Sequence, residues 1–394
     1  MTLSTTILPG TTSTGDRGSE SVRAVRRSAA TPAARAALPH KARGAISAPQ
    51  GRFASELREA ADDGWGGSAE PVAELETVVI EQRARSIVQK NDSPDLPFDL
   101  SINPYQGCEH GCIYCYARPS YGYLELSAGL DFESRIFAKI NAAELLREEL
   151  ARPGYRASPI ALGANTDCYQ PAERRYGITR AVIEVLAECE HPLTLITKSA
   201  LVERDLDLLA PMAAKNLAKV FVTVTTLDVD LARRLEPRAA SPQRRLDTIR
   251  ALASAGVPVG VMLAPVIPAL NDKSIEEVFE AAAAAGAAGA GYQLLRLPHE
   301  LKTLFRDWLA IHYPLRAEHV MGVLRQIRGG RDNDSHFGTR MTGSGTYAEL
   351  IAKRFEIACR RFGLNGADRG RGARRELDCT RFQPPLAGGQ MTLF

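Results

Sequence analysis

Short apolar runs rich in β-branched residues alternate with longer amphipathic stretches along the chain from about residue 97. This alternation is typical of repeated βα units that build a parallel sheet. The predicted strands cover residues 98–102, 159–163, 193–197, 220–225, 257–263 and 291–295. The predicted helices follow them at 134–150, 177–189, 203–215, 242–255, 274–285 and 300–311. Six such units predict an α/β fold, a partial (β/α)6 barrel of the TIM type with its helices outside.

This rhythm defines a core barrel at residues 97–312, and the flanking segments differ from it in composition. Residues 1–45 are basic, rich in Ala, Ser, Thr and Gly and poor in aromatic residues, which predicts a disordered N-terminal arm. Residues 46–96 are predicted to form a short prelude of loop and strand or helix. Residues 313–365 are predicted to form a helical C-terminal extension, and residues 366–394 a flexible tail.

Composition and cysteine usage indicate an ordinary globular protein of a reducing compartment. The 394 residues are 45% hydrophobic and 24% charged, and the net charge of +3 does not by itself imply a polyanionic partner. Four of the seven cysteines are scattered, so they form no disulfide framework. Clustered thiols that bind a metal need a reducing compartment, so we expect the protein in the cytoplasm. We expect no secretion signal and no membrane span, because the N-terminus lacks a charged and an apolar region and no apolar run is long enough.

Charge is concentrated at the N-terminus, where residues 1–60 carry nine Lys and Arg against four Asp and Glu. Such an arm either contacts the phosphates of a nucleic acid or is a solvated leader, and the sequence does not separate the two.

The strongest chemical signal is the loop Cys108-Glu-His110-Gly-Cys112-Ile-Tyr-Cys115-Tyr116. The spacing supplies three thiolates, one fewer than the four that close a structural zinc site or an ordinary iron–sulfur site. A cluster of four irons held by three cysteines keeps one iron open to an outside ligand. Two alternatives are a zinc site completed by His110 or a distant cysteine, and three buried thiols that only pack. Neither explains the aromatic residues on both sides of the third cysteine.

The cysteine loop resembles the signature of radical S-adenosylmethionine enzymes. The resemblance implies a [4Fe–4S] cluster held by Cys108, Cys112 and Cys115, whose open iron binds the methionine part of S-adenosylmethionine. It also implies an electron donor such as flavodoxin or ferredoxin, and reductive cleavage of the cofactor to a 5′-deoxyadenosyl radical. The cofactors supply that chemistry, and the protein supplies binding, orientation and shielding.

Across residues 97–300 the sequence is similar to the spore photoproduct lyase branch of this superfamily, and more closely to uncharacterised bacterial relatives of that lyase. Individually weak motifs support this by their order along the chain. They are Tyr114-Cys115-Tyr116, Asn165-Thr166-Asp167, Ile196-Thr-Lys198-Ser199, Thr225-Thr-Leu-Asp228, Glu236-Pro-Arg238 and Ala264-Pro-Val-Ile-Pro-Ala-Leu-Asn271-Asp272. The resemblance implies an action on nucleic acid, such as DNA repair.

The barrel places functional residues at the carboxyl ends of its strands, where polar residues accumulate in this sequence. The resemblance implies that Tyr116 lies near the adenine and that the loop after the second strand meets the methionine amino group. Lysine suits a carboxylate and threonine suits a ribose, although Lys198 can also be a solvated residue just past its strand. Glu236 and Arg238 either form a buried pair or contact the cofactor. The predicted cofactor-binding residues are Tyr116, Asn165, Thr166, Lys198, Ser199, Thr223, Thr225 and Arg238.

One position departs from the lyase pattern. The lyase returns a hydrogen atom to its product radical from a cysteine after the second strand, and the corresponding residue here is Ala164. The nearest thiol, Cys168, is either a hydrogen donor acting from a shifted position or an inert buried residue. The resemblance therefore does not by itself imply reversal of a thymine lesion.

The C-terminal region carries two further candidates. Helices are predicted at 315–328 and 346–362, and His336 and Arg340 between them are candidates to line the open side of the barrel. The last five residues, Gln390-Met-Thr-Leu-Phe394, resemble the short peptide by which bacterial repair proteins dock on the DNA sliding clamp, although five residues can match by chance.

The sequence thus predicts a cytoplasmic radical enzyme that acts on nucleic acid. One rival is the same radical chemistry on RNA or a peptide. The other is a metal-bearing adaptor for the sliding clamp that no longer turns over.

Overall fold

Six parallel strands form the centre of the fold and follow one another in chain order. The computed structural model describes residues 42–49, 51–53, 75–366 and 376–385. The strands of the main sheet are β2 (Val88–Lys90), β3 (Leu100–Ile102), β6 (Ile160–Leu162), β7 (Leu193–Thr197), β8 (Ala218–Thr223), β9 (Val259–Val266) and β10 (Gly289–Leu294). Their order across the sheet is β10-β9-β8-β7-β6-β3-β2, with only β2 antiparallel to its neighbour. Because the sheet ends at β10 and β2, the barrel is open. The structure confirms all six predicted strands.

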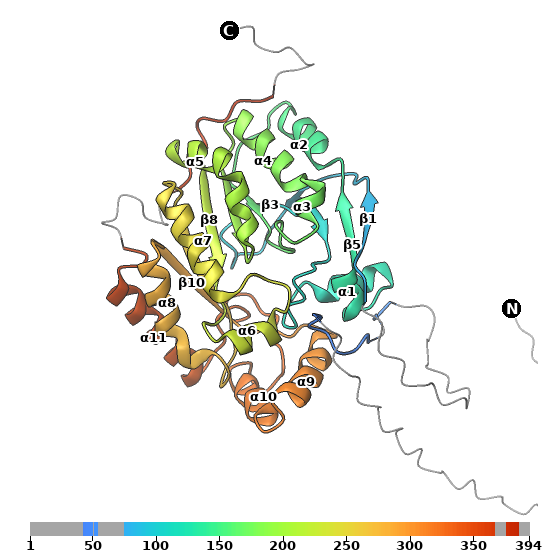
Figure 1. Cartoon of the computed structure of the whole chain (residues 1–394), viewed down its shortest axis with the longest axis vertical. Helices are drawn as coiled ribbons and strands as arrows, with labels where there is room; N and C mark the ends of the chain where they lie inside the picture. Colours follow the sequence, from blue (N-terminus) through green and yellow to red (C-terminus); the bar gives the residue numbers. More distant parts are fainter. Residues whose placement is uncertain (1–41, 50, 54–74, 367–375, 386–394) are drawn as a thin grey trace, which may run out of the picture. The chain divides into compact units, whose positions relative to one another are not determined.

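Helices between the parallel strands, and one after β10, cover the sheet (Figure 1). They are η1 (Arg118–Leu124), α3 (Glu173–Tyr176), α4 (Ile178–Glu188), η2 (Ala200–Asp205), α5 (Leu206–Ala214), α6 (Val229–Leu235), α7 (Pro242–Ser254), η3 (Asp272–Ser274), α8 (Ile275–Ala284) and α9 (Leu301–His312). Helix α7 shows why they form. Ser241 caps its first turn by accepting a hydrogen bond from Arg244 N–H, and Pro242 occupies the first position, where its fixed φ suits a helix. Leu246, Ile249 and Leu252 then lie on the buried face.

The helix predicted at 134–150 is wrong in its first half. The structure has α1 (Leu130–Ser134), β5 (Arg135–Lys139) and α2 (Ala142–Leu150) there. Strand β5 pairs in parallel with β1 (Val78–Gln82) and antiparallel with β4 (Tyr105–Gln106) in a second sheet. The reason is local, because the buried residues of β5 alternate along it with a period of two.

Two predicted boundaries also move. Arg43, Gly44 and Ala45 were predicted in the N-terminal arm, but they are buried in the structure. Strand β2 joins the main sheet although it precedes residue 97. The rest of the predicted arm, residues 1–41, lies outside the described residues.

The C-terminal extension contains the two predicted helices, α10 (Ala317–Gln326) and α11 (Thr346–Phe362). Helix α11 packs on α8, where Arg354 Nε donates to Glu276 Oε1 at 2.8 Å.

Residues 376–385 were predicted to belong to the flexible tail, yet they are fixed at the amino ends of β7 and β8. Asp378 N–H donates to Asn216 O at 3.0 Å, and Gln383 N–H donates to Cys189 O at 2.9 Å. Residues 390–394 lie outside the described part of the chain. Within the described part, no helix combines the length and the apolar character that crossing a bilayer needs.

Candidate functional site

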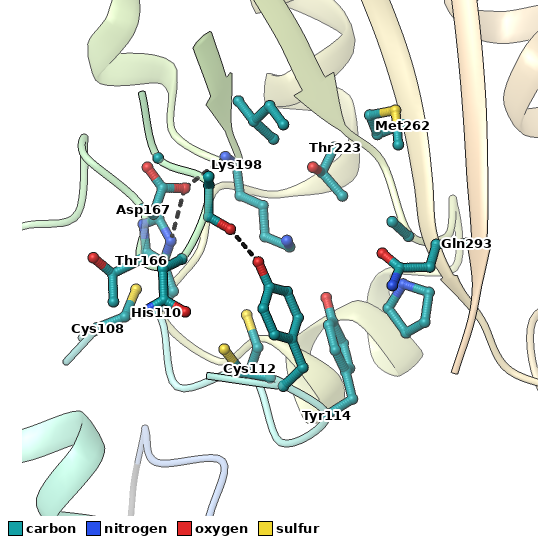
Figure 2. Close-up of a pocket in the computed structure, with 18 of the residues that line it drawn as sticks. Cys108, His110, Cys112, Tyr114, Thr166, Asp167, Lys198, Thr223, Met262 and Gln293 are labelled. Carbon is teal, nitrogen blue, oxygen red and sulfur yellow. Dashed lines mark hydrogen bonds and ion pairs between the residues drawn. The ribbon is translucent and has the colours of Figure 1, made fainter. Parts of the chain in front are cut away.

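A single cavity collects the loops that leave the carboxyl ends of the parallel strands (Figure 2). Its volume is about 960 Å³ including the open solvent at its mouth. The cysteine loop after β3 lines one side, and residues 163–167 after β6, Lys198 after β7 and Thr223 at the end of β8 line others. This is where the barrel rule places an active site.

All three cysteines of the loop line this cavity. Cys108 and Cys112 are buried, and Cys115 is half-buried. Burial raises the pKa of the Cys112 thiol to about 12, although the nearby charge of Lys198 acts to lower it. Burial also raises the pKa of the Cys108 thiol. Such thiols become thiolates when a cationic metal group binds them.

The three cysteine thiols share one cavity. Within the described residues, no group of three or more His, Cys, Asp or Glu side chains is arranged as a site for a metal ion. Three thiols around one cavity suit a larger body with several metal atoms.

The backbone of the cysteine loop is fixed from three directions. Cys108 N–H donates to Phe132 O at 3.0 Å, Ile113 N–H donates to Leu235 O at 3.1 Å, and Arg118 Nε donates to Cys112 O at 2.8 Å. Gly111 has a φ of +68°, a conformation that favours glycine. The loop is therefore held in shape by its surroundings.

Asp167 joins the loops after β3, β6 and β7. Its carboxylate accepts hydrogen bonds from Thr197 Oγ1 and from Lys198 N–H, both at 2.7 Å, and lies 3.3 Å from His110 Nδ1. Burial alone would raise the pKa of Asp167, but His110 and these hydrogen bonds lower it to about 2. Neither His110 nor Asp167 was predicted as a cofactor contact, although both belong to motifs that the sequence displays.

A second buried carboxylate, Glu236, binds the hydroxyl of Tyr114 and does not itself line the cavity. Glu236 accepts hydrogen bonds from Tyr114 Oη, from Arg245 and, at 2.6 Å, from Thr225 Oγ1. Burial would raise the pKa of Glu236, but Arg245 and Lys198 lower it to about 2. Sequence reasoning missed Arg245, which reaches this site from α7.

The structure brings five of the eight predicted cofactor-binding residues to the cavity. They are Tyr116, Asn165, Thr166, Lys198 and Thr223. Three do not line it. Thr225 is buried against Glu236, and Ser199 Oγ caps η2 by accepting from Leu201 N–H. Arg238 pairs with Glu109 at 2.9 Å instead of with Glu236.

Cys168 does not reach the cavity either. It is 0% exposed, and its sulfur would lie 3.3 Å from a Cβ placed on Gly163, which itself lines the cavity. The carbonyl of Ala164 accepts a hydrogen bond from Tyr116 Oη. Among the described residues, the thiols that line the cavity are those of the cysteine loop.

The wall formed by β9 and β10 lies at the carboxyl ends of the strands, where polar residues were expected, although none of its residues was among the predicted cofactor contacts. Met262, Pro265, Gln293 and Arg296 line it. His336 and Arg340 do not line the cavity, and Arg340 instead pairs with Asp95, donating from Nε at 2.7 Å.

A family model described as the radical SAM superfamily matches residues 102–282, which include the cysteine loop and strands β4 to β9. This match places residues 102–282 in the radical S-adenosylmethionine superfamily. The cofactors of that superfamily are a [4Fe–4S] cluster and S-adenosylmethionine, and the cysteine cavity fits both.

Relatives of this radical SAM chain occur in bacteria and phages. Uncharacterised proteins of Mycobacterium bovis and Mycobacterium tuberculosis are 41% identical over 221 residues, and the match covers 56% of this chain and 65% of theirs. A radical SAM Nα-GlyT isomerase of Pseudomonas phage M6 is 27% identical over 190 residues, covering 48% of this chain and 37% of that protein.

Solved structures of spore photoproduct lyase share the fold. The lyase complexed with dinucleoside spore photoproduct has a TM-score of 0.54 and 16% identity, and the match covers 73% of this chain and 80% of that one. At this identity the likeness shows the fold alone, an α/β radical SAM fold with a parallel sheet.

Proposed function

We propose that this radical SAM chain cleaves S-adenosylmethionine reductively and directs the resulting radical to a nucleic-acid substrate. The observation that carries the proposal is the meeting of three cysteine thiols with Tyr116, Asn165, Thr166, Lys198 and Thr223 around one cavity. When bound, the cluster and its cofactor supply a 5′-deoxyadenosyl radical. The residues of the chain supply ligands for the cluster, orient S-adenosylmethionine and exclude water from the cavity.

Each lining residue has a role that its chemistry supports. The ammonium of Lys198 neutralises the methionine carboxylate, and the hydroxyl of Thr223 binds the ribose. Glu236, the buried carboxylate whose charge acts on Lys198, is already bound by Arg245. Tyr116 offers an aromatic face to the adenine. Met262 and Leu294 exclude water from the reacting groups.

Support for a nucleic-acid substrate comes from proteins similar to this one. The structurally similar lyase is complexed with a dinucleoside photoproduct. Ala164 replaces the hydrogen-donating cysteine of the lyase, so the chain acts on its substrate without a thiol at that position. RNA or a peptide remains the second candidate substrate.

The partners of the reaction follow from the same proposal. The chain takes electrons from a flavodoxin or ferredoxin in the cytoplasm, as the superfamily needs a reductant. The pentapeptide 390–394 docks on the bacterial sliding clamp, which would bring the enzyme to DNA. Deleting these five residues should abolish retention on immobilised clamp while leaving cofactor cleavage intact, and unchanged retention would refute the docking.

The decisive test is anaerobic reconstitution with iron and sulfide, followed by dithionite and S-adenosylmethionine. We expect four irons per chain and formation of 5′-deoxyadenosine and methionine. Cys112→Ala should abolish both. Cys379→Ala, at a thiol outside the cavity, should change neither. A parent protein that binds zinc, or that binds iron without cleaving the cofactor, would support the adaptor instead.

The substrate is tested next with ultraviolet-irradiated oligonucleotides carrying deuterium in their sugar and methyl groups. Transfer of deuterium into 5′-deoxyadenosine would identify the position attacked. Cleavage of the cofactor without any transfer from DNA, together with transfer from RNA or a peptide, would favour the second candidate.

A further inference from the structure

Two side chains at the end of β10 have strong donors and a poor acceptor. Gln293 Nε2 lies 2.9 Å from Met341 Sδ, and an Arg296 Nη lies 3.5 Å from the same sulfur. A thioether is a weak acceptor. The buried Nε of Arg296 has no hydrogen-bond partner among the described residues. The described residues thus offer the amide of Gln293 and the guanidinium of Arg296 a sulfur but no oxygen acceptor.

Among the described residues, no carboxylate forms an ion pair with the guanidinium of Arg296. Asp95 acts on it from a distance, but that carboxylate is bound by Arg340. Burial and the like charge of Arg340 lower the pKa of Arg296, which a bound anion would reverse.

Two cations therefore face the cavity from different walls. The Lys198 ammonium lies 5.8 Å from the ring centre of Tyr114, and the Arg296 guanidinium lies 5.8 Å from that of Tyr116. Their strands, β7 and β10, are separated by β8 and β9. Figure 2 shows Gln293 across the cavity from Asp167, which is bound to the backbone of Lys198. The methionine carboxylate of the cofactor is already assigned to Lys198. An anion bound by Arg296 would therefore have to be a second one.

The surroundings of Arg296 favour a phosphate beside a nucleobase. The ring of Phe337, 57% exposed, lies 4.6 Å from the guanidinium of Arg340, whose charge acts on Arg296. Exposed aromatic faces beside arginines are typical of surfaces on which bases stack. The planar fork of arginine matches the oxygens of a phosphate.

We propose that Arg296 and Gln293 bind a phosphate of the nucleic-acid substrate, next to the nucleoside that enters the cavity. This inference rests on the proposed function, because it assigns one wall of the same cavity to the substrate. It makes Arg296 a residue that selects substrates with a backbone phosphate over isolated nucleosides.

The test measures binding of two probes to the reconstituted protein with S-adenosylmethionine, by calorimetry under anaerobic conditions. The probes are the dinucleotide thymidylyl-(3′→5′)-thymidine and its uncharged methylphosphonate analogue. We expect the parent protein to bind the phosphodiester about tenfold more tightly, as one charge-assisted hydrogen bond would give. Arg296→Gln should bind both probes equally. Arg331→Gln, which removes an exposed arginine outside the cavity, should keep the preference.

Several results would overturn the inference. The parent protein could bind both probes equally, or bind neither. Arg296→Gln could weaken binding of S-adenosylmethionine without changing the preference between probes, which would assign Arg296 to the cofactor. A peptide with a free carboxylate could bind in an Arg296-dependent way while the phosphodiester does not. Failure of the proposed function is a separate result, because it appears as absence of 5′-deoxyadenosine in the parent protein and in Arg331→Gln.

Discussion

The guanidinium of Arg118 and the carboxylate of Glu133 form an ion pair in which both side chains are fully buried. Arg118 uses its Nε to hold the carbonyl of Cys112, a predicted cluster ligand. Glu133 also accepts hydrogen bonds from Gly44 N–H at 2.9 Å and Ala45 N–H at 2.8 Å. One buried pair therefore connects the N-terminal segment to the backbone of the cysteine loop.

Glu133→Gln should loosen the cysteine loop. The substitution leaves the Arg118 charge buried without its partner, which costs about 3–5 kcal/mol of unfolding free energy. We expect fewer irons per chain after reconstitution and a lower midpoint in urea, both measured anaerobically. The matched control is Glu144→Gln, which removes an exposed ion pair with Arg83 and should cost under about 1 kcal/mol. Equal iron content in the two variants would refute a role for Glu133 in holding the loop.

Gly44→Ala tests the same connection from the N-terminal side. A Cβ at Gly44 would lie 1.7 Å from Gly111 O, so the segment or the cysteine loop must shift. We expect a loss of about 1–3 kcal/mol in unfolding free energy, the usual cost of overpacking. Gly322→Ala in α10 has open space around it, and we expect it to be neutral or stabilising. Faster loss of the cluster absorbance in air for Gly44→Ala alone would show that the segment shields the loop.

Lys198→Met should weaken cofactor binding, because it removes the cation proposed to face the methionine carboxylate. We expect the dissociation constant for S-adenosylmethionine to rise by about tenfold to a hundredfold. Calorimetry on the reconstituted protein measures this directly. Lys215→Met removes a lysine outside the cavity that pairs with Glu190, and binding should not change. An unchanged constant for Lys198→Met would assign the carboxylate to another group.

Stability should depend on pH through His191, which is buried beside Tyr155 and Phe382. Burial lowers the pKa of His191 from its ordinary 6.5 to about 4. Between these values the unfolded chain binds more protons than the folded chain, so stability falls as the pH falls from 6.5 to 4. The loss from this group is about 3 kcal/mol, at 1.36 kcal/mol per pKa unit.

The measurement is the unfolding free energy of the parent and of His191→Phe at several pH values. The variant cannot take up the proton, so its stability should fall less over that range. His319→Phe, at an exposed histidine, should follow the parent. Parallel curves for the parent and His191→Phe would show that another group controls the acid response.

The sequence predicted the parts of this molecule that carry a local signal. The βα rhythm located all six parallel strands, and the spacing of Cys108, Cys112 and Cys115 located the cavity. Chain order also brought Lys198 and Thr223 to that cavity, because each follows or ends a parallel strand.

What the sequence did not predict depends on contacts between distant segments. Strand β5 was taken for helix because its partner β1 lies more than fifty residues earlier. Thr225 was assigned to the cofactor, but Glu236 and Tyr114 bind its hydroxyl in the interior. Arg238 pairs with Glu109, which lies far from it in the sequence, instead of with its neighbour Glu236.

The segment 376–385 has a consequence for how this enzyme could work on a long polymer. It is bound at the amino ends of β7 and β8, whereas the cavity opens at the carboxyl ends of the same strands. The sequence after Pro385 therefore starts from the side of the barrel remote from the cavity. For the proposed binding of residues 390–394 to a partner, the connection would begin at the end of the barrel opposite the mouth of the cavity.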